Sequence, residues 1–371
     1  MKTHAIIPIF IPHEGCPHDC IFCNQNAITA RSSAPSEESV VDTIEQWLTT
    51  ISVDPHIRTR EIAFYGGSFT GIPIELQSRY LEIAKRYKDS GKIDKIHLST
   101  RPDYIDDLIL SNLSHYRVDI IELGVQSFDE NVLRMSNRGH SADIVYRSAQ
   151  LIKDHGFELG IQLMIGLPGD SHEKCLFSAR ETVRIAPSIA RLYPTVIIKH
   201  TGLFELYKAG RYKALSTAEA VETTKEMYKI LTGAGINVIR IGLKSTDHIR
   251  TACTTGSSKL LTHDNIDDSG DVAGGDFHPA FRQLVEATIA REKMDANLVI
   301  LLSQSFLNLE TKNEKTDHIR LTFTCNSVSF SNMIGNSRSN KLYFAAKFPF
   351  LRIRYAVDNR IVPGEYQAEI E

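Results

Sequence analysis

The sequence predicts an α/β protein, built as a partial (β/α)6 TIM-type barrel with a small C-terminal α/β appendage. Two observations lead to this prediction. Strand-like apolar segments alternate with helix-like segments six times over residues 5–241, with a weak seventh strand at the end, which is the pattern of βα units around a parallel sheet. The residues able to carry chemistry cluster directly after predicted strands, at the edge where barrel and doubly wound folds bind ligands.

Composition sets the broad class of the protein. The chain has 371 residues, 42% apolar and 23% charged, which is ordinary for a globular protein, and its net charge of −3 produces no global basic field. Cys175, Cys253 and Cys325 are isolated and show no disulfide framework. No stretch has the build of a signal peptide or a membrane span. We therefore expect a cytoplasmic protein with no membrane partner.

The first predicted strand leads into the most informative loop. Ala5–Phe10 is apolar, and Cys16-Pro-His-Asp-Cys20-Ile-Phe-Cys23 follows it with the spacing C-x3-C-x2-C. Three thiolates so close can hold three irons of a [4Fe–4S] cube and leave the fourth iron open. An open metal position is typical of catalytic rather than structural sites. Because His13 and His18 flank the thiolates, a Cys3His zinc site is the alternative.

The other barrel elements follow from hydrophobic periodicity and from cap residues. Ser36 can cap a first helix, whose apolar positions Val40, Val41, Ile44 and Leu48 have helical spacing. Further strands are predicted at Glu61–Tyr65, Lys95–Leu98, Asp119–Val125, Glu158–Ile165, Ala190–Ile198 and Asn237–Ile241. Further helices are predicted at Ile74–Tyr87, Tyr104–Leu113, Glu130–Met135, Ala142–His155, His172–Ile185 and Thr217–Thr232.

The pattern changes from about Ser245. We divide the chain into a barrel at 1–245, a linker with a helical extension at 246–312, and a small α/β appendage at 313–371. Within these, Thr254–Asp276 has loop composition, Phe281–Lys293 is helix-like, and strands are predicted at Leu298–Leu302, His318–Phe323 and Leu351–Tyr355, with room for a helix between the last two. We expect the appendage to shape access to the barrel mouth or to recruit the substrate, without supplying cluster ligands.

The cysteine loop resembles the signature of the radical S-adenosylmethionine (radical SAM) superfamily, C-x3-C-x-aromatic-C, with Phe22 in the aromatic position. The resemblance implies that SAM chelates the open iron and that the reduced cluster cleaves it to a 5′-deoxyadenosyl radical. It also implies an electron donor such as flavodoxin or ferredoxin. In this superfamily the motif matching Gly66-Gly67-Ser68 binds the amino group of SAM; a glycine pair after a strand is by itself usually a tight turn.

Two further candidates come from a likeness to oxygen-independent coproporphyrinogen oxidases. In those relatives the residues matching Gln126 and Arg138 contact the ribose and carboxylate of SAM, and the planar fork of arginine suits a carboxylate. Taken singly, such residues are usually solvated surface. Ser99 and Gln162 stand where the relatives carry acids, although the Gln162 amide can still hydrogen-bond a ribose hydroxyl.

A finer resemblance, over roughly residues 6–245, is to the radical SAM domain of the Elongator catalytic subunit. It rests on Ser99-Thr-Arg-Pro-Asp-Tyr-Ile, Glu122-Leu-Gly-Val-Gln-Ser, Asn137-Arg-Gly-His, Tyr193-Pro-Thr and the long motif from Thr201 to Lys213. That family modifies the wobble uridine of tRNA with acetyl-CoA. No basic arm precedes Cys16 and no acetyltransferase glycine loop follows Gly242, so we do not transfer acetyl-CoA use.

The resemblances favour a radical SAM enzyme that modifies RNA, in particular tRNA. The alternatives are an enzyme acting on a small molecule, as the coproporphyrinogen oxidases do, and a non-catalytic iron–sulfur or RNA-binding module. One more clue is the run Ser331–Asn340, which contains Ile-Gly-Asn-Ser-Arg and is faintly similar to the loop with which KH domains clamp a nucleic-acid backbone. Arg338 replaces its second glycine, and Lys347, Arg352 and Arg354 add local positive charge; an ordinary turn on a structural appendage is the competing interpretation.

Overall fold

The computed structural model describes residues 3–11, 20–24, 34–51, 53–243, 272–275, 277–309 and 319–370. The chain divides into two compact units, which we call the barrel unit, Met1–Pro279, and the C-terminal unit, Ala280–Glu371. Of the helices in the described ranges, none has the length and apolar character needed to cross a membrane.

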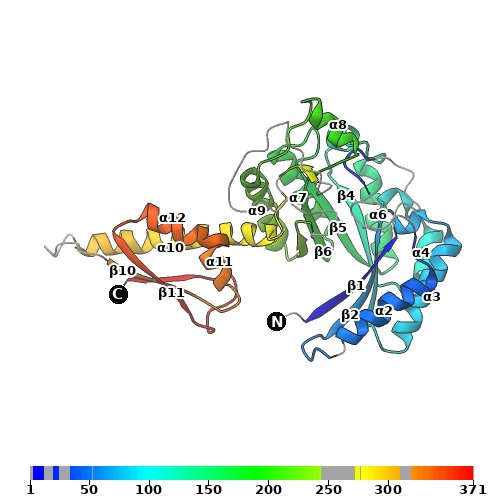
Figure 1. Ribbon diagram of the computed structural model, residues 1–371, viewed down its shortest axis with the longest axis horizontal. Coiled ribbons are helices and arrows are strands. Elements are labelled where there is room, and N and C mark those ends of the chain that lie inside the picture. The colour runs from blue at the N-terminus through cyan, green and yellow to red at the C-terminus, as the bar shows by residue number, and fades with distance from the viewer. Residues whose placement is uncertain are drawn as a thin grey trace. The chain divides into compact units, whose positions relative to one another are not determined.

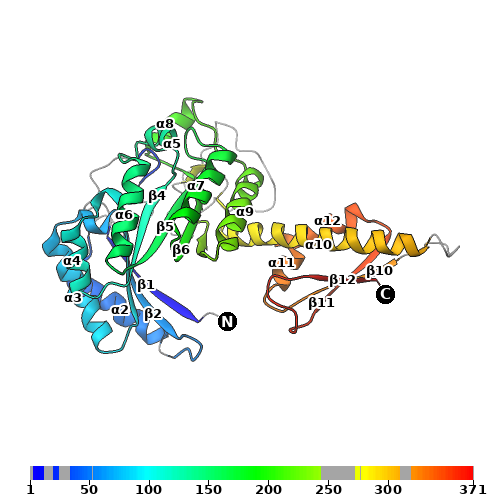
Figure 2. The ribbon, with the colours of Figure 1, turned by 180° about the vertical axis from the view of Figure 1, so that it is seen from behind.

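The barrel unit is built on one parallel sheet of seven strands, in the order β1-β2-β3-β4-β5-β6-β8. Figure 1 shows this sheet curled and flanked by helices, and Figure 2 shows it from behind. The sheet stays open because β1 and β8 are its two edges and do not pair. The predicted partial barrel is therefore confirmed. Its strands are β1 His4–Ile11, β2 Thr59–Gly66, β3 Lys95–Thr100, β4 Ile120–Gln126, β5 Glu158–Ile165, β6 Ile189–Pro194 and β8 Asn237–Ile241.

Five of the connecting helices, α4, α5, α7, α8 and α9, begin directly after a residue whose side chain caps their first turn. Asp106, Asp129, Ser171, Thr201 and Ser216 each accept a hydrogen bond from a backbone N–H in the first turn of the following helix. The helices of the unit are α2 Glu37–Ile51, α3 Ile74–Asp89, α4 Asp107–His115, α5 Glu130–Met135, α6 Ala142–Asp154, α7 His172–Ile185, α8 Gly202–Lys208 and α9 Thr217–Gly233, with single turns η1 Phe69–Gly71 and η2 Pro102–Tyr104.

Two predicted elements of the barrel region differ in the structure, and one helix is additional. The helix predicted at Tyr104–Leu113 is two pieces, η2 and α4, because Asp106 is extended and caps α4. The strand predicted at Ala190–Ile198 ends at Pro194, and β7 (Ile197–Ile198) pairs instead with β9 (Val272–Gly274) in antiparallel register. Helix α8 was not predicted. Most of the loop predicted at Thr254–Asp276 lies outside the described residues.

The C-terminal unit packs helices on one face of a three-stranded sheet, visible in Figures 1 and 2. The strand order is β11-β10-β12, with β10 (Ile319–Cys325) parallel to β11 (Leu351–Val357) and antiparallel to β12 (Gln367–Ile370). Its helices are α10 Phe281–Leu309, α11 Phe330–Ile334 and α12 Ser339–Lys347, with a single turn η3 at Asn336–Arg338. The predicted α/β appendage and its strands are confirmed, and so is a helical connection between the last two predicted strands.

One prediction in this region was wrong, because Leu298–Leu302 is helix rather than strand. These residues belong to α10, whose buried positions Ala290, Met294, Leu298 and Leu302 recur every fourth residue. That spacing puts them on one helix face, against Phe323 and Phe344 of the same core. The KH-like run Ser331–Asn340 covers most of α11, the turn η3 and the start of α12. A Cβ on Gly335 would come 2.4 Å from Ser339 Oγ. An RNA-clamping role for this run stays a prediction.

Candidate cofactor-binding site

Most of the predicted site residues that the structure describes lie where the first strands end. Because all seven strands are parallel, their carboxyl ends meet at one edge of the sheet. At this edge β2 brings the Gly66 turn, β3 brings Arg101 and β4 brings Gln126, and Cys20 of the cysteine loop lies against Arg101. Arg138 follows α5.

The cysteine loop is described from Cys20 to Asn24. Cys16, His13 and His18 lie outside the described residues, so the choice between cluster and zinc is not made by their positions. Cys20 is buried, Cys23 is half-buried, and neither forms a disulfide. The loop is anchored at Ile21, whose N–H donates to Ser136 O at 3.2 Å and whose carbonyl accepts from Leu203 N at 2.6 Å.

The anchor at Ile21 explains the motif that starts at Thr201. The Thr201 side chain caps α8, and Gly202 lets this helix approach closely, since a Cβ there would lie 3.2 Å from Ile21 Cβ. Helix α8 thus holds the cysteine loop in place through its contacts with Ile21. Phe22, the residue at the aromatic position, is half-buried in the turn between the two described cysteines.

The glycine pair after β2 has a structural reason in this chain. Gly66 has φ +129°, and a Cβ at this position would lie 2.2 Å from the Ile11 carbonyl oxygen. Gly67 N donates to the same oxygen at 3.1 Å. Ser68 Oγ lies 2.7 Å from Thr100 Oγ1, so this buried hydroxyl ties the end of β2 to that of β3. The turn therefore packs against the end of β1, and its contact with SAM stays a prediction.

Arg138 lies beside Cys20, and Gln126 lies close to Arg138. Arg138 is 6% exposed, its Nη1 donates to Cys20 Sγ at 3.4 Å, and its Nη2 donates to the Gly124 carbonyl oxygen. Gln126 has φ +73° at a bulge that ends β4. Gly124 leaves room for both side chains, since a Cβ there would be 3.1 Å from Arg138 Nη2 and from Gln126 Nε2. The structure thus brings Arg138 to the cysteine loop and puts Gln126 near Arg138.

A second guanidinium at this sulfur was missed from the sequence. Arg101 is 2% exposed, its Nη1 lies 3.8 Å from Cys20 Sγ, and its Nη2 donates to Arg138 O at 2.7 Å. It pairs with Asp103 at 2.8 Å. Burial raises the pKa of the Asp103 carboxyl, but the Arg101 guanidinium outweighs burial and holds that pKa below its usual value. The signal in the sequence is a charged residue three positions after the predicted strand Lys95–Leu98, inside the motif that begins at Ser99.

Several buried polar atoms in this neighbourhood have no partner within the described part of the chain. They are Gln126 Oε1, Ser136 Oγ, Arg138 Nε and His140 Nε2. Burial, helped by the neighbouring Arg138, lowers the pKa of His140 to about 4, so this imidazole is neutral at neutral pH. Buried groups normally find partners, and unpaired ones call for an explanation. Two guanidiniums, a thiol and these unpaired donors and acceptors fit an anionic iron–sulfur cluster with a polar ligand beside it.

Gln162 lies deeper inside the barrel, beside a buried polar layer. It is opposite Gly124 on β4 and Arg191 on β6, and its side chain hydrogen-bonds Glu122. Ser99 is opposite Glu122. Gln162 therefore lies on β5, beside Gly124 of β4, and not at the cysteine loop. Its contact with SAM stays a prediction.

The polar layer joins four strands through buried ion pairs. His97 Nδ1 lies 2.6 Å from Glu61 Oε1, His97 Nε2 lies 3.1 Å from Glu122 Oε2, and Arg191 Nε lies 2.8 Å from Glu122 Oε1. Arg191 Nη2 also donates to Tyr65 Oη at 2.5 Å. Sequence reasoning missed this layer, although its residues alternate with apolar ones along each strand, which is the period of side chains facing a barrel interior.

The pKa values of the layer follow from opposing effects. Burial raises the pKa of Glu61, but hydrogen bonds from His4 and His97 lower it to about 2. Burial also raises the pKa of Glu122, which Arg191 and His97 bring below its usual value. For His97 burial lowers the pKa, and the two carboxylates raise it above the usual histidine value. The layer is therefore an alternating chain of charges that neutralise one another.

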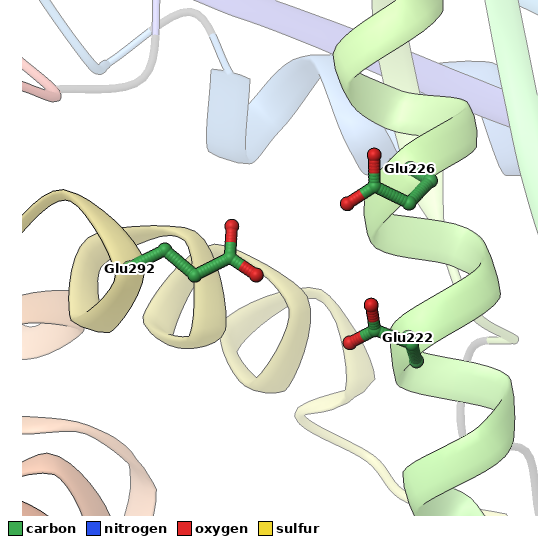
Figure 3. A group of neighbouring side chains, drawn as sticks. All are labelled: Glu222, Glu226 and Glu292. Carbon is green, nitrogen blue, oxygen red and sulfur yellow. The ribbon is translucent and has the colours of Figure 1, made fainter. Parts of the chain in front are cut away.

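A group of carboxylates drawn in Figure 3 is not assigned to a metal. Glu222 and Glu226 point from one side of α9, one turn apart, and Glu292, drawn with them, belongs to α10 of the C-terminal unit. Lys225 Nζ lies 2.7 Å from Glu222 Oε1 and 3.2 Å from Glu226 Oε1. The α9 carboxylates thus already share a cation.

Two protein-family models match the chain one after the other. The model described as Radical SAM superfamily matches residues 10–181, and the one described as Radical_SAM C-terminal domain matches residues 187–291. The first match includes the cysteine loop, the Gly66 turn, Gln126, Arg138 and Gln162. The second includes α8, α9 and the start of α10.

Curated relatives match the same region. The tRNA uridine(34) acetyltransferase of Methanocaldococcus infernus is 28% identical over 255 residues, which are 59% of this chain and 48% of that protein. Elongator complex protein 3 of Homo sapiens is 27% identical over 260 residues, again 59% of this chain and 48% of that protein. The chain thus spans about half the length of the curated relatives it matches.

A solved structure supports the fold. The archaeal Elp3 of Methanocaldococcus infernus with an N-terminal deletion has a TM-score of 0.52 and 23% identity, covering 66% of this chain and 61% of that chain. At that identity the likeness concerns the fold alone. The two consecutive family matches identify the chain as a member of the radical SAM superfamily of enzymes, and the parallel half-barrel agrees with them.

Proposed function

We propose that this chain cleaves SAM reductively at a [4Fe–4S] cluster in order to modify RNA, in particular tRNA. The observation that carries the proposal is the convergence of Cys20, Arg101, Arg138 and Gln126 at the carboxyl ends of the strands. A buried thiol in contact with two guanidinium groups does little to hold the fold together. It suits a thiolate that binds an anionic cluster.

Each residue has a stated task in this proposal. Cys16, Cys20 and Cys23 hold three irons, and the fourth iron takes SAM. When bound, the reduced cluster supplies the electron that cleaves SAM to a 5′-deoxyadenosyl radical. Gly66, Gly67 and Ser68 offer backbone groups to the methionine end of SAM, and Gln126, Arg138 and Gln162 offer side-chain donors and acceptors to its carboxylate and ribose; Phe22 packs in the cysteine loop.

The substrate class rests on the named relatives. A tRNA uridine(34) acetyltransferase and Elongator complex protein 3 match the part of the chain that carries the proposed site. Because the match covers only about half of each relative, it supports tRNA as the substrate but does not indicate which chemical group is added. The proposal includes an electron donor such as flavodoxin or ferredoxin, and a reducing cytoplasm, where thiolates stay free to bind iron.

The cofactor is tested by anaerobic reconstitution. The wild type should bind about four irons per chain, the content of one cube, and should release 5′-deoxyadenosine from SAM after reduction. Cys16→Ala, Cys20→Ala and Cys23→Ala should each lose the cluster. Cys325→Ala is the matched control, because this buried thiol belongs to the C-terminal core and should leave iron content unchanged. Tight stoichiometric zinc without a cluster would overturn the proposal.

The substrate is tested by following the radical. Deuterium should move from labelled tRNA into 5′-deoxyadenosine, and nucleoside analysis should reveal a new modified base. If SAM is cleaved but deuterium arrives only from a small-molecule substrate, the cofactor chemistry stands and the RNA assignment fails.

A further inference from the structure

The outer face of the sheet in the C-terminal unit carries an unusual set of charges. Leu321, Phe323 and Cys325 of β10 face the core, so Arg320, Thr322 and Thr324 face outward. On β11, Ile353 and Tyr355 pack against the core, so Arg352 and Arg354 face outward. None of the unit's own helices lies on this side in Figures 1 and 2. We call this surface the arginine face.

The three arginines of this face lie side by side. Arg320 is directly opposite Arg352 in the parallel register, and Thr322 is opposite Arg354. Neighbouring strands are about 4.8 Å apart, and like charges directly opposite one another are unfavourable. All three side chains are exposed, and together with Thr322 they line one shallow depression. Such an arrangement needs a compensating anion or a function that uses it.

The protein does not neutralise these cations in the described part of the unit. No carboxylate there lies within 4.0 Å of Arg320, Arg352 or Arg354, whereas other cations of the unit are paired: Lys293 with Glu365 at 2.8 Å, Lys347 with Asp295 at 2.6 Å and Arg360 with Asp358 at 2.6 Å. The described carboxylate on the arginine face is Glu369, opposite Thr322 on β12, on the other side of the central strand from β11. Positive charge is therefore in excess.

We propose that the arginine face binds the phosphate backbone of the RNA substrate. The choice of RNA rests on the proposed function, and the surface itself supports phosphate. Guanidinium forks bind phosphate oxygens in pairs, and the Thr324 hydroxyl on the same face of β10 can donate to the same groups. The outward positions carry no aromatic side chain among the described residues, so this face contacts backbone and does not stack bases.

An acidic protein is the competing partner, and the composition of the face disfavours it. The cores of protein–protein interfaces are apolar and rich in aromatic residues. Among the described outward residues of this sheet, Ala356 is the one apolar side chain. A flat polar surface with unpaired arginines matches a repeating phosphate chain better than a folded protein.

The test compares two triple variants of the full chain with equal changes of net charge. Arg320→Gln, Arg352→Gln and Arg354→Gln together remove the unpaired cations of the arginine face. The control combines Lys293→Gln, Lys347→Gln and Arg360→Gln, which removes paired cations of the same unit. Binding of fluorescent tRNA is titrated over a series of salt concentrations. Circular dichroism confirms that each variant is folded.

The expected result is a change in salt dependence. Each lost phosphate contact should reduce the slope of log Kd against log salt by roughly 0.7–0.9, so three contacts should reduce it by about 2–3. Between about 50 and 200 mM salt, the wild type should then lose roughly 20- to 40-fold more affinity than the arginine-face variant. The control variant should keep the wild-type slope. A triple Arg→Lys variant should also keep it, since counterion release depends on charge.

Other outcomes separate this inference from the proposed function. If the wild type binds tRNA and the arginine-face variant has the same affinity and slope, the inference is overturned while the RNA substrate stands. If the wild type binds polyglutamate through these arginines and does not bind tRNA, an acidic protein partner replaces RNA. SAM cleavage measured without RNA in the same variants reports on the cofactor site independently of either result.

Discussion

Replacing His97 with asparagine should destabilise the barrel unit by about 3 kcal/mol, the lower end of the ~3–5 kcal/mol lost when one partner leaves a buried ion pair. His97 is fully buried between Glu61 at 2.6 Å and Glu122 at 3.1 Å, and a shorter neutral amide cannot bridge both. The estimate is at the lower end because Glu122 keeps Arg191 at 2.8 Å and Glu61 keeps His4 at 3.0 Å. At roughly 2–4 °C per kcal/mol, Tm should fall by about 6–12 °C.

The stability lost in His97→Asn should depend on pH, because His97 and Glu61 titrate at different pH values in the folded and unfolded states. The raised pKa of His97 gives stability that is present below pH 6.5, its ordinary pKa, and is lost as pH rises through the folded value. The pKa of Glu61, lowered from 4.5 to about 2, gives stability that is present above 4.5 and is lost as pH falls towards 2. The difference in free energy of unfolding between wild type and variant should therefore be largest between pH 4.5 and 6.5. It should become smaller at lower and at higher pH.

The assay is urea unfolding followed by tryptophan fluorescence. The chain has a single tryptophan, Trp47 in α2, so the signal reports on the barrel unit. His155→Asn is the matched control, because His155 makes a surface pair with Asp107 at 3.0 Å and such pairs contribute at most about 1 kcal/mol. If His97→Asn costs no more than this control, or if its cost is the same from acid to alkaline pH, the proposed charge coupling is refuted.

Two further predictions concern the edge of the sheet that carries the site. Gly66→Ala should destabilise the barrel unit by roughly 2–6 kcal/mol, because the residue has a positive φ and its Cβ would lie only 2.2 Å from the last carbonyl oxygen of β1. Gly91→Ala is the control: it has a positive φ but open space around the Cβ, and should cost about 1–2 kcal/mol in the same fluorescence assay. Equal losses of stability in the two variants would contradict the contact with β1. Arg138→Gln should lower the reduction potential of the reconstituted cluster by roughly 60 mV, because it removes one charged hydrogen bond to the Cys20 sulfur. Arg134→Gln, on the exposed side of α5, is the control and should leave the potential unchanged. Redox titration followed by EPR without SAM measures both, and an unchanged potential in Arg138→Gln would refute the sulfur contact.

Local patterns in the sequence were sufficient for the architecture of the barrel. Glu158–Ile165 and His172–Ile185 have the predicted bounds because an apolar run ends at a glycine turn and Ser171 caps the next helix. The fold class follows from repeating that local alternation. The cysteine spacing and the positions of Gly66 and Gln126 after strands are also local, so the edge that carries the site could be predicted. Leu298–Leu302 was wrong because a short apolar segment has no clear period of its own.

Only the tertiary structure decided which side chains meet. Cys20 and Arg138 are 118 positions apart, and Cys20 and Arg101 are 81 apart. No local pattern records such distances, because they are set by the curvature of the sheet and the register of its strands. The same holds for His97, whose charge state depends on carboxylates from β2 and β4, and for the arginine face, where strand register places Arg320 against Arg352. Hydrophobic period and capping act between near neighbours in the chain, whereas ion pairing and close approach act between neighbours in space.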